Sequence, residues 1–402
     1  MIKFVENFEP PGQLETPVLY MVFNRLDIVE KAFGQIRKAK PKKLYIAQDG
    51  PRPHVPDEKD KILKVREYIL SNIDWDCEVK TLFREENLGI NKAIPGAVDW
   101  FFENEEKGII LEEDIYMSLS GFWFLEKMLN KFKDDKDVWF VLAYNVIDIP
   151  YDYIKTDSFC AWGYATWKDK WMRIDFSHRE DLSFLDEYFE NKRIAKFNKA
   201  FFNHGKYLYD SKIWLEMVFN KAYSILPKTP LSVHLGWFNG TNMISDAFNE
   251  NLFKYHSTVE TLKDIDISLL EDYENLNPIR LYEIGEILAE THNIFAAIHS
   301  KKAENNIKNM LSKYNKIAIY GAGMLGYLLY ATYDDLLNDK VCCFLDDNPQ
   351  CDELFGKPVL KPENMPQDIE LIVISPQSKA AYQNMKKKVS SKDVVWIEDL
   401  VF

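Results

Sequence analysis

The chain has 402 residues, of which 47% are hydrophobic and 14% aromatic, so it can form roughly two or three buried cores and is too rich in aromatics to be disordered. Its formal net charge of −13 argues against general nucleic-acid binding. Five cysteines without C-x-x-C spacing fit a reducing cytosol, the N-terminus lacks the features of a secretion signal, and no stretch has the roughly 18 apolar residues of a membrane span. We therefore expect a cytoplasmic protein.

The segment from residue 17 to about residue 145 alternates short apolar runs with longer amphipathic stretches. In chain order these are PVLYMVF, DIVEKAFGQIRKA, KLYIAQDG, DEKDKILKVREYILSNI, CEVKTLF, KAIPGAVDWFFEN and GIILEE. The short runs have the length of buried strands, and the amphipathic stretches have the spacing of helices. The alternation predicts an α/β fold, in which a parallel sheet is joined by crossover helices.

Three further segments follow. Residues 146–257 are less regular and crowded with aromatics, which is typical of loops that pack beside a sheet and carry substrate contacts. Residues 258–314 are polar and helix-forming, and indicate a helical connector. Residues 315–402 restart the strand and helix alternation, which predicts a second, small Rossmann-like domain. The first domain is expected to cover residues 1–257.

Polar residues follow four of the apolar runs, at the strand ends where parallel sheets bind ligands. They are Asn24 and Arg25, Asp49, Arg84 and Asn87, and the acidic cluster Glu112, Glu113 and Asp114. Adjacent carboxylates repel each other, and Mg²⁺ or Mn²⁺ commonly joins one or two of them to substrate phosphates, so the acidic cluster is a candidate metal site. The alternative is a solvated turn with Asp114 as the N-cap of the next helix, and the octapeptide GIILEEDI taken alone favours that turn.

Six separated stretches follow the order and spacing of a known family. They are PVLYMVFNR (17–25), IAQDGPR (46–52), FREENLGINKAI (83–94), GIILEEDI (108–115), CAWGYATWKDKW (160–171) and SVHLGWFNGTNM (232–243). Together they resemble nucleotide-sugar-dependent glycosyltransferases of the GT-A fold, and are most similar to the inverting N-acetylglucosaminyltransferase I type and to bacterial surface-polysaccharide transferases. The resemblance implies a mixed Rossmann-like sheet with flanking helices, with a donor half at about 17–145 and an acceptor half at about 146–257.

The resemblance also implies roles for the acidic cluster. The family's motif usually ends in Glu-Asp-Asp, and Glu113 replaces its middle Asp here. By position, Asp114 is the metal ligand, Glu113 contacts the ribose, and Glu112 lies near the donor sugar. The Glu at position 113 keeps the charge and lengthens the reach.

The donor nucleotide is expected at the other strand ends. Asp49 in QDG matches the family residue that reads the uracil edge. Arg25, Arg52 and Arg84 are candidates for binding the base, ribose or diphosphate, because a guanidinium fork can hold phosphate oxygens bidentately. Asn24 and Asn87 complete this set. For each arginine, the alternative is a surface salt bridge.

Later segments supply further candidates. Trp162 is expected in a loop over the donor sugar or the acceptor, because aromatic faces pack well on sugar rings, with ordinary core packing as the alternative. Trp167 and Trp171 are expected in the core. His234 and Asn242 occupy a loop in which the family often has polar residues near the diphosphate or the acceptor.

An inverting transferase needs a base that removes the proton of the acceptor hydroxyl. The similar enzymes place it in an acidic turn that precedes a helix, and Asp210 in YLYDSKIWLEMVF holds that position. The alternative is that Asp210 only caps the helix. Glu216, farther along the same helix, is the second candidate for the base.

The C-terminal segment IAIYGAGMLG has the G-x-G-x-x-G turn, with Gly321, Gly323 and Gly326 placed between a strand and a helix. Asp346 and Asp347 follow the next strand. The spacing fits nucleotide binding, and the unit resembles a small sugar-nucleotide-binding domain of bacterial acetyltransferases and methyltransferases. Three roles stay open: a scaffold, a nucleotide or nucleotide-sugar sensor, and a docking module.

The leading hypothesis is a metal-dependent, inverting glycosyltransferase that uses Mn²⁺ or Mg²⁺ and a UDP-sugar, with UDP-GlcNAc as one candidate donor. Its acceptor would be a glycan or lipid-linked glycan hydroxyl in surface polysaccharide assembly, which is compatible with peripheral attachment to the inner face of a membrane and with a homo-oligomer. Two alternatives remain: a non-catalytic sugar-nucleotide-binding protein, and an NAD-linked sugar-modifying enzyme that uses the C-terminal domain.

Overall fold

The computed structural model describes residues 3–145, 149, 151–205, 207–235, 261–271, 273, 276–278, 297–376 and 379–401. The chain forms two compact units. The first holds the described residues of Met1–Ser177, Leu208–Gly240 and Ser257–Leu281, and the second holds those of His178–Tyr207, Thr241–His256 and Tyr282–Phe402. Residues 178–207 are therefore grouped with the C-terminal segment, whereas the sequence pattern predicts them in the acceptor half. Asn242 and much of the expected connector lie outside the described residues.

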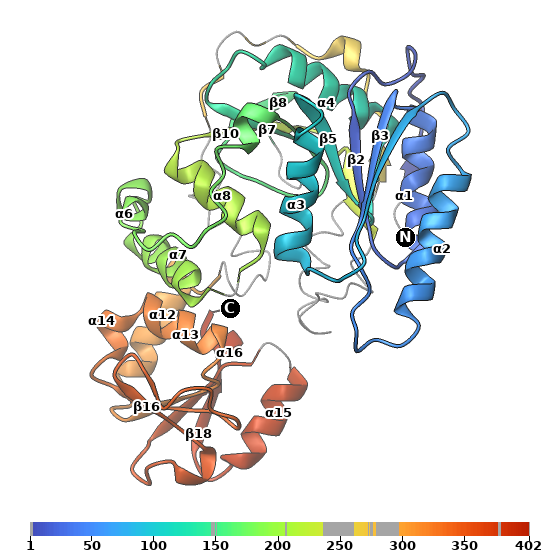
Figure 1. Cartoon of the computed structure of the whole chain (residues 1–402). Coiled ribbons are helices and arrows are strands. Elements are labelled where there is room, and N and C mark those ends of the chain that lie inside the picture. Colours follow the sequence, from blue (N-terminus) through green and yellow to red (C-terminus); the bar gives the residue numbers. More distant parts are fainter. Residues whose placement is uncertain are drawn as a thin grey trace. The chain divides into compact units, whose positions relative to one another are not determined.

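The first unit is built on a mixed eight-stranded sheet with the order β4-β3-β2-β5-β9-β7-β10-β8 (Figure 1). Its strands are β2 (Val18–Val22), β3 (Lys43–Gln48), β4 (Glu78–Phe83), β5 (Lys107–Glu112), β7 (Val138–Leu142), β8 (Tyr153–Thr156), β9 (Tyr164–Trp167) and β10 (Tyr223–Pro227). β4, β3, β2 and β5 are parallel, and β9 is antiparallel to both β5 and β7. The expected α/β fold with a mixed sheet is confirmed.

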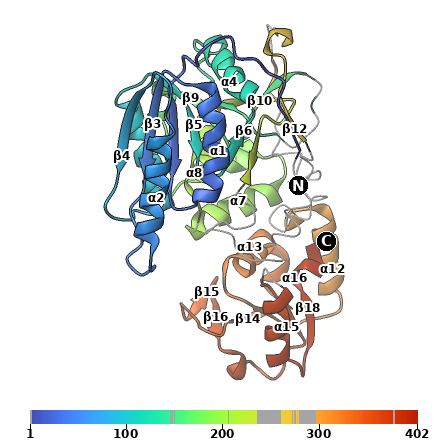
Figure 2. The same ribbon diagram turned by 90° about the vertical axis from the view of Figure 1, so that its right-hand side faces the viewer.

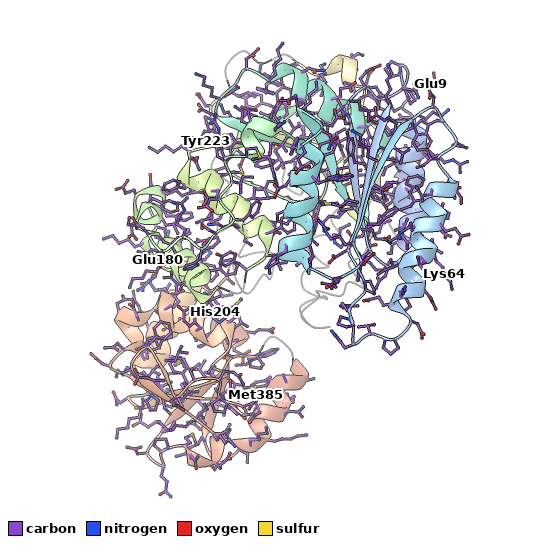
Figure 3. All side chains as sticks on the ribbon, in the orientation of Figure 1. Glu9, Lys64, Glu180, His204, Tyr223 and Met385 are labelled. Carbon is purple, nitrogen blue, oxygen red and sulfur yellow. The ribbon has the colours of Figure 1, made fainter. Side chains whose placement is uncertain are left out.

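Helices cover both faces of this sheet because its buried strands are apolar on both sides. One face packs α1 (Leu26–Ala39), α2 (Glu58–Ser71) and α4 (Leu119–Lys131), and the exposed Lys64 on α2 points away from the sheet (Figures 2 and 3). The other face packs α3 (Ile90–Phe102) and α8 (Tyr209–Phe219).

Four short strands, a short α-helix and a 3₁₀ helix belong to the rest of the first unit. β1 (Lys3–Val5) pairs with β12 (Thr261–Lys263), and β6 (Ile115–Met117) pairs with β11 (Ser232–His234). α5 (Lys168–Trp171) follows β9, and η2 is a short 3₁₀ helix (Ile267–Leu269). The β6–β11 pair positions the candidate site, because it brings residue 234 back to the acidic cluster.

The second unit has a six-stranded sheet with the order β15-β16-β14-β13-β17-β18, parallel except for β15. Its strands are β13 (Ile317–Tyr320), β14 (Val341–Leu345), β15 (Glu353–Leu354), β16 (Lys357–Leu360), β17 (Leu371–Ile374) and β18 (Asp393–Trp396). Its helices are α6 (Phe184–Tyr188), α7 (Lys192–His204), α12 (Lys301–Leu311), α13 (Met324–Thr332), α14 (Asp334–Leu337), α15 (Lys379–Lys388) and α16 (Ile397–Val401), with a 3₁₀ turn at Pro362–Asn364.

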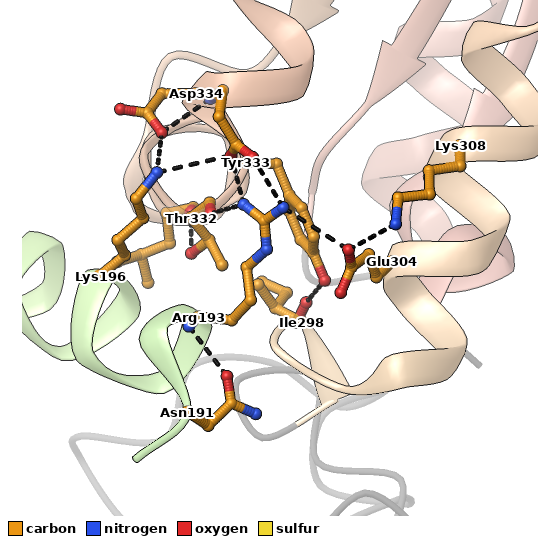
Figure 4. Close-up of polar contacts among 11 residues, drawn as sticks. Asn191, Arg193, Lys196, Ile298, Glu304, Lys308, Thr332, Tyr333 and Asp334 are labelled. Atoms are coloured by element: carbon orange, nitrogen blue, oxygen red, sulfur yellow. Dashed lines mark hydrogen bonds and ion pairs between the residues drawn. The ribbon is translucent and has the colours of Figure 1, made fainter. Parts of the chain in front are cut away.

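Helix α7 belongs to the core of the second unit although it lies about a hundred residues before the C-terminal sheet in the sequence. Its apolar residues Phe197 and Ala200 join the same buried core as the residues of α13. Arg193 donates from Nη1 to the carbonyl of Thr332 at 2.9 Å, pairs with Asp335, and lies over the ring of Tyr333 at 4.7 Å (Figure 4). These contacts explain why the two segments form one compact unit.

No helix within the described ranges has the length and apolar character needed to cross a membrane.

Candidate active site

The carboxyl ends of β2 and β5 are neighbours, because the strands pair in parallel with Met21 opposite Glu112. This pairing brings Arg25, at the start of α1, to the acidic cluster. Arg25 donates from Nε to Glu113 Oε1 at 2.5 Å and from Nη2 to Asp114 Oδ2 at 2.6 Å. We call this arrangement of Arg25, Glu113 and Asp114 the carboxylate–arginine cluster.

The cluster is buried, so the segment is not a solvated turn. Glu113 is 5% exposed and Asp114 6% exposed, and the N-cap of α4 is Ser118 rather than Asp114. Glu113 also accepts the backbone N–H of Phe23 at 2.7 Å. Burial raises the pKa of Glu113, and the charge of Arg25 opposes that shift. One guanidinium therefore offsets part of the repulsion between two buried carboxylates.

His234 approaches the cluster from β11, where it pairs with Ile115 of β6. Its Nε2 lies 3.4 Å from Asp114 Oδ2. Burial lowers the pKa of His234 despite the opposing charge of Asp114, so the imidazole is neutral at pH 7. The ring of Trp162 lies 4.9 Å from that of His234, and the Trp162 carbonyl accepts the hydroxyl of Ser232. Trp162, predicted to line the site, thus contacts His234, which lies beside Asp114.

Glu112 faces the other side of β5, because successive strand residues point to opposite faces. Its Oε1 accepts the hydroxyl of Tyr209 at 2.6 Å. Burial raises the pKa of Glu112, and the charge of Asp114 raises it further. The structure therefore separates Glu112 from Glu113, although the two are adjacent in the sequence.

Asp210 lies in the first turn of α8, next to Tyr209, and the N-cap residue is Leu208. Its Oδ1 accepts the backbone N–H of Ser211 at 2.7 Å, and Oδ2 has no hydrogen-bond partner among the described residues. Burial raises the pKa of Asp210. Asp210 therefore has one oxygen available for chemistry, whereas Glu216, the second candidate, is buried in an ion pair with Lys212 at 3.1 Å.

Asp49 and Asn87 hold two loops together at the carboxyl ends of β3 and β4. The carboxylate of Asp49 accepts the N–H groups of Leu88 and Gly89, each at 3.1 Å. Asn87 donates from Nδ2 to the carbonyl of Gly50 at 2.9 Å. Both predicted residues are thus at the expected strand ends, and these hydrogen bonds hold the loops together.

The other predicted nucleotide-binding residues have different surroundings. Arg52 and Asn24 both bind Glu58, which is 1% exposed: Arg52 Nε lies 3.0 Å and Asn24 Nδ2 2.8 Å from Oε1. Arg84 follows β4, and in the part of the chain that the structure describes it has no acidic partner. Glu58 carries no sequence signal beyond its place at a helix start, so the sequence does not predict its contacts with Arg52 and Asn24.

The glycine turn of the second unit has the geometry that its sequence predicts. Gly321 has φ +111°, and a Cβ on Gly326 would lie 2.1 Å from the carbonyl oxygen of Gly321. Asp346 accepts the N–H of Ala322 at 3.1 Å, and Asp347 accepts the hydroxyl of Tyr320 at 2.6 Å. The two glycines are therefore required by backbone conformation and close packing.

The carboxylate of Asp114 and the imidazole of His234 could bind a divalent ion whose other ligands come from the substrate. A carboxylate is a preferred ligand of Mg²⁺ and Mn²⁺, and neutral imidazole is a common metal ligand. Within the described ranges, no three His, Cys, Asp or Glu side chains are arranged to hold an ion. Mg²⁺ on a phosphate substrate is usually bound by one or two carboxylates together with the phosphate oxygens. The buried Nη1 of Arg25 has no hydrogen-bond partner in the described chain, which suits a phosphate oxygen.

A comparison with protein-family models finds no match for this chain, and neither does a comparison with curated proteins.

Among solved structures, the chain is similar to the mannosyltransferase PcManGT from Pyrobaculum calidifontis in complex with GDP-Man and Mn²⁺. The two chains are 12% identical, with a TM-score of 0.37 and 83% of each chain covered. It is also similar to S. aureus TarS 1–349, with 10% identity, a TM-score of 0.37, and 81% of this chain and 88% of that chain covered. A third is the apo-form glycosyltransferase GlyE of Streptococcus pneumoniae TIGR4, with 12% identity, a TM-score of 0.28, and 95% and 91% covered.

Proposed function

We propose that the protein is a metal-dependent, inverting glycosyltransferase that moves a sugar from a UDP-sugar, with UDP-GlcNAc as one candidate, to a hydroxyl of a glycan or lipid-linked glycan in surface polysaccharide assembly. The observation that carries the proposal is the buried carboxylate–arginine cluster, with His234 beside it, at the carboxyl ends of parallel strands. A lipid-linked acceptor would place the enzyme at the inner face of a membrane.

The donor diphosphate would bind at this cluster. Asp114, with His234 beside it, would hold Mn²⁺ or Mg²⁺, and Nη1 of Arg25 would donate to a phosphate oxygen. When bound, the ion stabilises the charge that develops on the departing diphosphate. Glu113 keeps Arg25 oriented, because it accepts from Nε while Nη1 faces the ligand. Asp49, at the end of β3, is the proposed contact of the base.

Asp210 is the proposed base because its Oδ2 is available and its position starts a helix beside β5. As the acceptor oxygen bonds to the anomeric carbon, the bond from that carbon to the phosphate oxygen breaks and its electron pair leaves with the diphosphate. The proton of the acceptor hydroxyl passes to Oδ2 of Asp210. Attack from the face opposite the diphosphate inverts the anomeric configuration.

Donor hydrolysis tests the proposal. Purified protein is incubated with a panel of UDP- and GDP-sugars, with and without Mn²⁺, and release of the nucleoside diphosphate is measured. We expect Mn²⁺-stimulated release from at least one donor and its loss in Asp114→Ala, with the exposed Asp74→Ala as the control. Failure of the wild-type protein to release diphosphate from any donor, combined with nicotinamide binding at the Gly321–Gly326 turn, would favour the NAD-linked alternative.

A further inference from the structure

A second polar group lies beside the carboxylate–arginine cluster, at the carboxyl end of β5 where Glu112 ends the strand. Tyr164 of β9 pairs with Ile110 of β5, and Glu112, two residues farther along β5, points to the same face. Tyr164, Ile110 and Tyr209 belong to one buried core. Tyr164, Glu112 and Tyr209 therefore share this side of the sheet.

Tyr209 fixes one side of this group. It is 4% exposed, and its hydroxyl donates to Glu112 Oε1 at 2.6 Å. This bond joins residues that are 97 positions apart in the sequence. Since Asp210 follows Tyr209 directly at the start of α8, the bond also fixes where Asp210 lies relative to β5.

Tyr164 supplies the observation that points to a ligand. The residue is 0% exposed, and among the described residues its hydroxyl has no hydrogen-bond partner. A buried hydroxyl usually has a partner, because burial without one loses its bonds to water. Burial raises the pKa of Tyr164, and the carboxylates of Glu112 and Asp210 raise it further, so the hydroxyl stays protonated.

The chemistry of the group selects a neutral, hydroxyl-rich ligand. In the described chain, the contacts of Glu112 and Asp210 include no Lys or Arg side chain, so this group lacks the cation that a phosphate would need. A sugar hydroxyl can both donate to a carboxylate and accept from a phenol. The free oxygen of Asp210 and the free hydroxyl of Tyr164 match two such hydroxyls of one sugar.

We propose that Tyr164, Asp210 and the Glu112 held by Tyr209 form the acceptor-sugar site, beside the carboxylate–arginine cluster at the carboxyl end of β5. This assigns Glu112 to the acceptor rather than to the donor sugar that its motif position implies. This inference rests on the proposed function and deepens it. Asp210 receives the proton of the attacking hydroxyl, and Tyr164 donates to or accepts from a neighbouring hydroxyl of the same sugar. Tyr209 is a positioning residue, because its hydroxyl holds Glu112 and because Asp210 follows it directly in the chain.

The proposed site is tested by removing the hydroxyl of Tyr164. Tyr164→Phe deletes a hydroxyl that has no partner in the described chain, so the variant is expected to fold with a melting temperature no lower than that of the wild type. The probes are methyl glycosides of glucose, galactose, mannose and N-acetylglucosamine, titrated by saturation-transfer NMR in the presence of Mn²⁺ and UDP. We expect at least one glycoside to bind the wild type, with about a tenfold weaker affinity for Tyr164→Phe, since a lost hydrogen bond to a sugar hydroxyl has an effect of this order.

Tyr153→Phe is the matched control. Tyr153 is also 0% exposed in the first unit, but its hydroxyl donates to the carbonyl of Glu271 at 3.1 Å. This variant is expected to lose some thermal stability and to keep its glycoside affinity. Equal glycoside binding by the wild type and Tyr164→Phe, or no glycoside binding by the wild type, would overturn the site. A wild type that binds glycosides through Tyr164 but releases no diphosphate from any donor would instead overturn the proposed transferase function alone.

Discussion

The guanidinium of Arg25 lies 2.6 Å from the carboxylate of Asp114, measured between Nη2 and Oδ2, and both side chains are largely buried. Because the same guanidinium also binds Glu113, its removal leaves two buried carboxylates without their cation. Arg25→Met is therefore expected to lower the free energy of unfolding by about 3–5 kcal/mol. Urea unfolding measures this loss.

Arg37→Met is the control for Arg25, since Arg37 pairs with Asp74 at the surface with both side chains about half exposed. This pair is expected to contribute less than about 1 kcal/mol. A loss at Arg25 no greater than the loss at Arg37 would show that the cluster is not a buried ion pair in solution.

Asp210→Asn is expected to keep the UDP affinity and to lose transfer by roughly 10²- to 10⁴-fold, the usual contribution of a general base. The amide oxygen can still accept the N–H of Ser211, so the first turn of α8 keeps its bond. Calorimetry gives the affinity, and product formation gives the rate. Equal losses of folding, UDP binding and transfer would identify Asp210 as a structural residue.

Gly326 and Gly323 are expected to differ in their tolerance of alanine. A Cβ at Gly326 would meet the carbonyl oxygen of Gly321 at 2.1 Å, whereas a Cβ at Gly323 has no heavy atom within 4 Å among those described. Gly326→Ala should destabilise the second unit by about 1–3 kcal/mol, and Gly323→Ala should change it by less than about 1 kcal/mol. Hydrogen exchange of peptides from β13 and β17 reports on this unit. Similar exchange in the two variants would contradict the close packing at Gly326.

His299 makes the stability of the second unit dependent on pH. It is 9% exposed and packs edge-on against the ring of Phe197 at 5.2 Å. Burial lowers the pKa of His299 from 6.5 to about 4, so the unfolded chain binds the proton more readily than the folded chain. The contribution of neutral His299 to the free energy of unfolding is fully present above pH 6.5. It is lost progressively as pH falls from 6.5 to 4, by an amount on the order of 1–3 kcal/mol.

The pH prediction is checked by urea unfolding between pH 4 and pH 7.5 in the wild type and His299→Gln. The variant should have a shallower dependence between pH 4 and 6.5, because it removes the titrating group. His178→Gln, at an exposed histidine of the same unit, is the control. Identical slopes in the wild type and His299→Gln would rule out the buried neutral imidazole.

Much of the fold follows from local sequence patterns. The apolar runs ending at Val22, Gln48 and Glu112 predict neighbouring parallel strands, because such runs are typical of strands buried on both faces. The run ending at Phe83 forms β4 at the edge of the sheet, where its residues are exposed or partly exposed. Helix α7 is amphipathic, and that pattern predicts a helix with one buried face. The amphipathic pattern does not predict in which of the two hydrophobic cores this face is buried. Its place in the second unit depends on contacts of Phe197 and Arg193 with residues far along the chain.

The candidate site was predictable only in part. Clustered polar residues at strand ends indicate Arg25 and Asp114, because parallel strands bring their carboxyl ends to one edge. Strand alternation implies that Glu112 and Glu113 face opposite ways, but it does not supply the partner of either. Tyr209 reaches Glu112 only through the packing of α8 on the sheet, and no local pattern encodes that contact.

The central claim is that a divalent ion joins Asp114 to the diphosphate of a sugar nucleotide. Calorimetric titration of UDP into the wild type and Asp114→Asn, each with and without Mn²⁺, tests it most directly. We expect Mn²⁺ to tighten UDP binding to the wild type by at least about tenfold, or roughly 1.4 kcal/mol, and to have no such effect on Asp114→Asn. Equal UDP affinities with and without Mn²⁺ in the wild type, or an equal gain in Asp114→Asn, would contradict the claim.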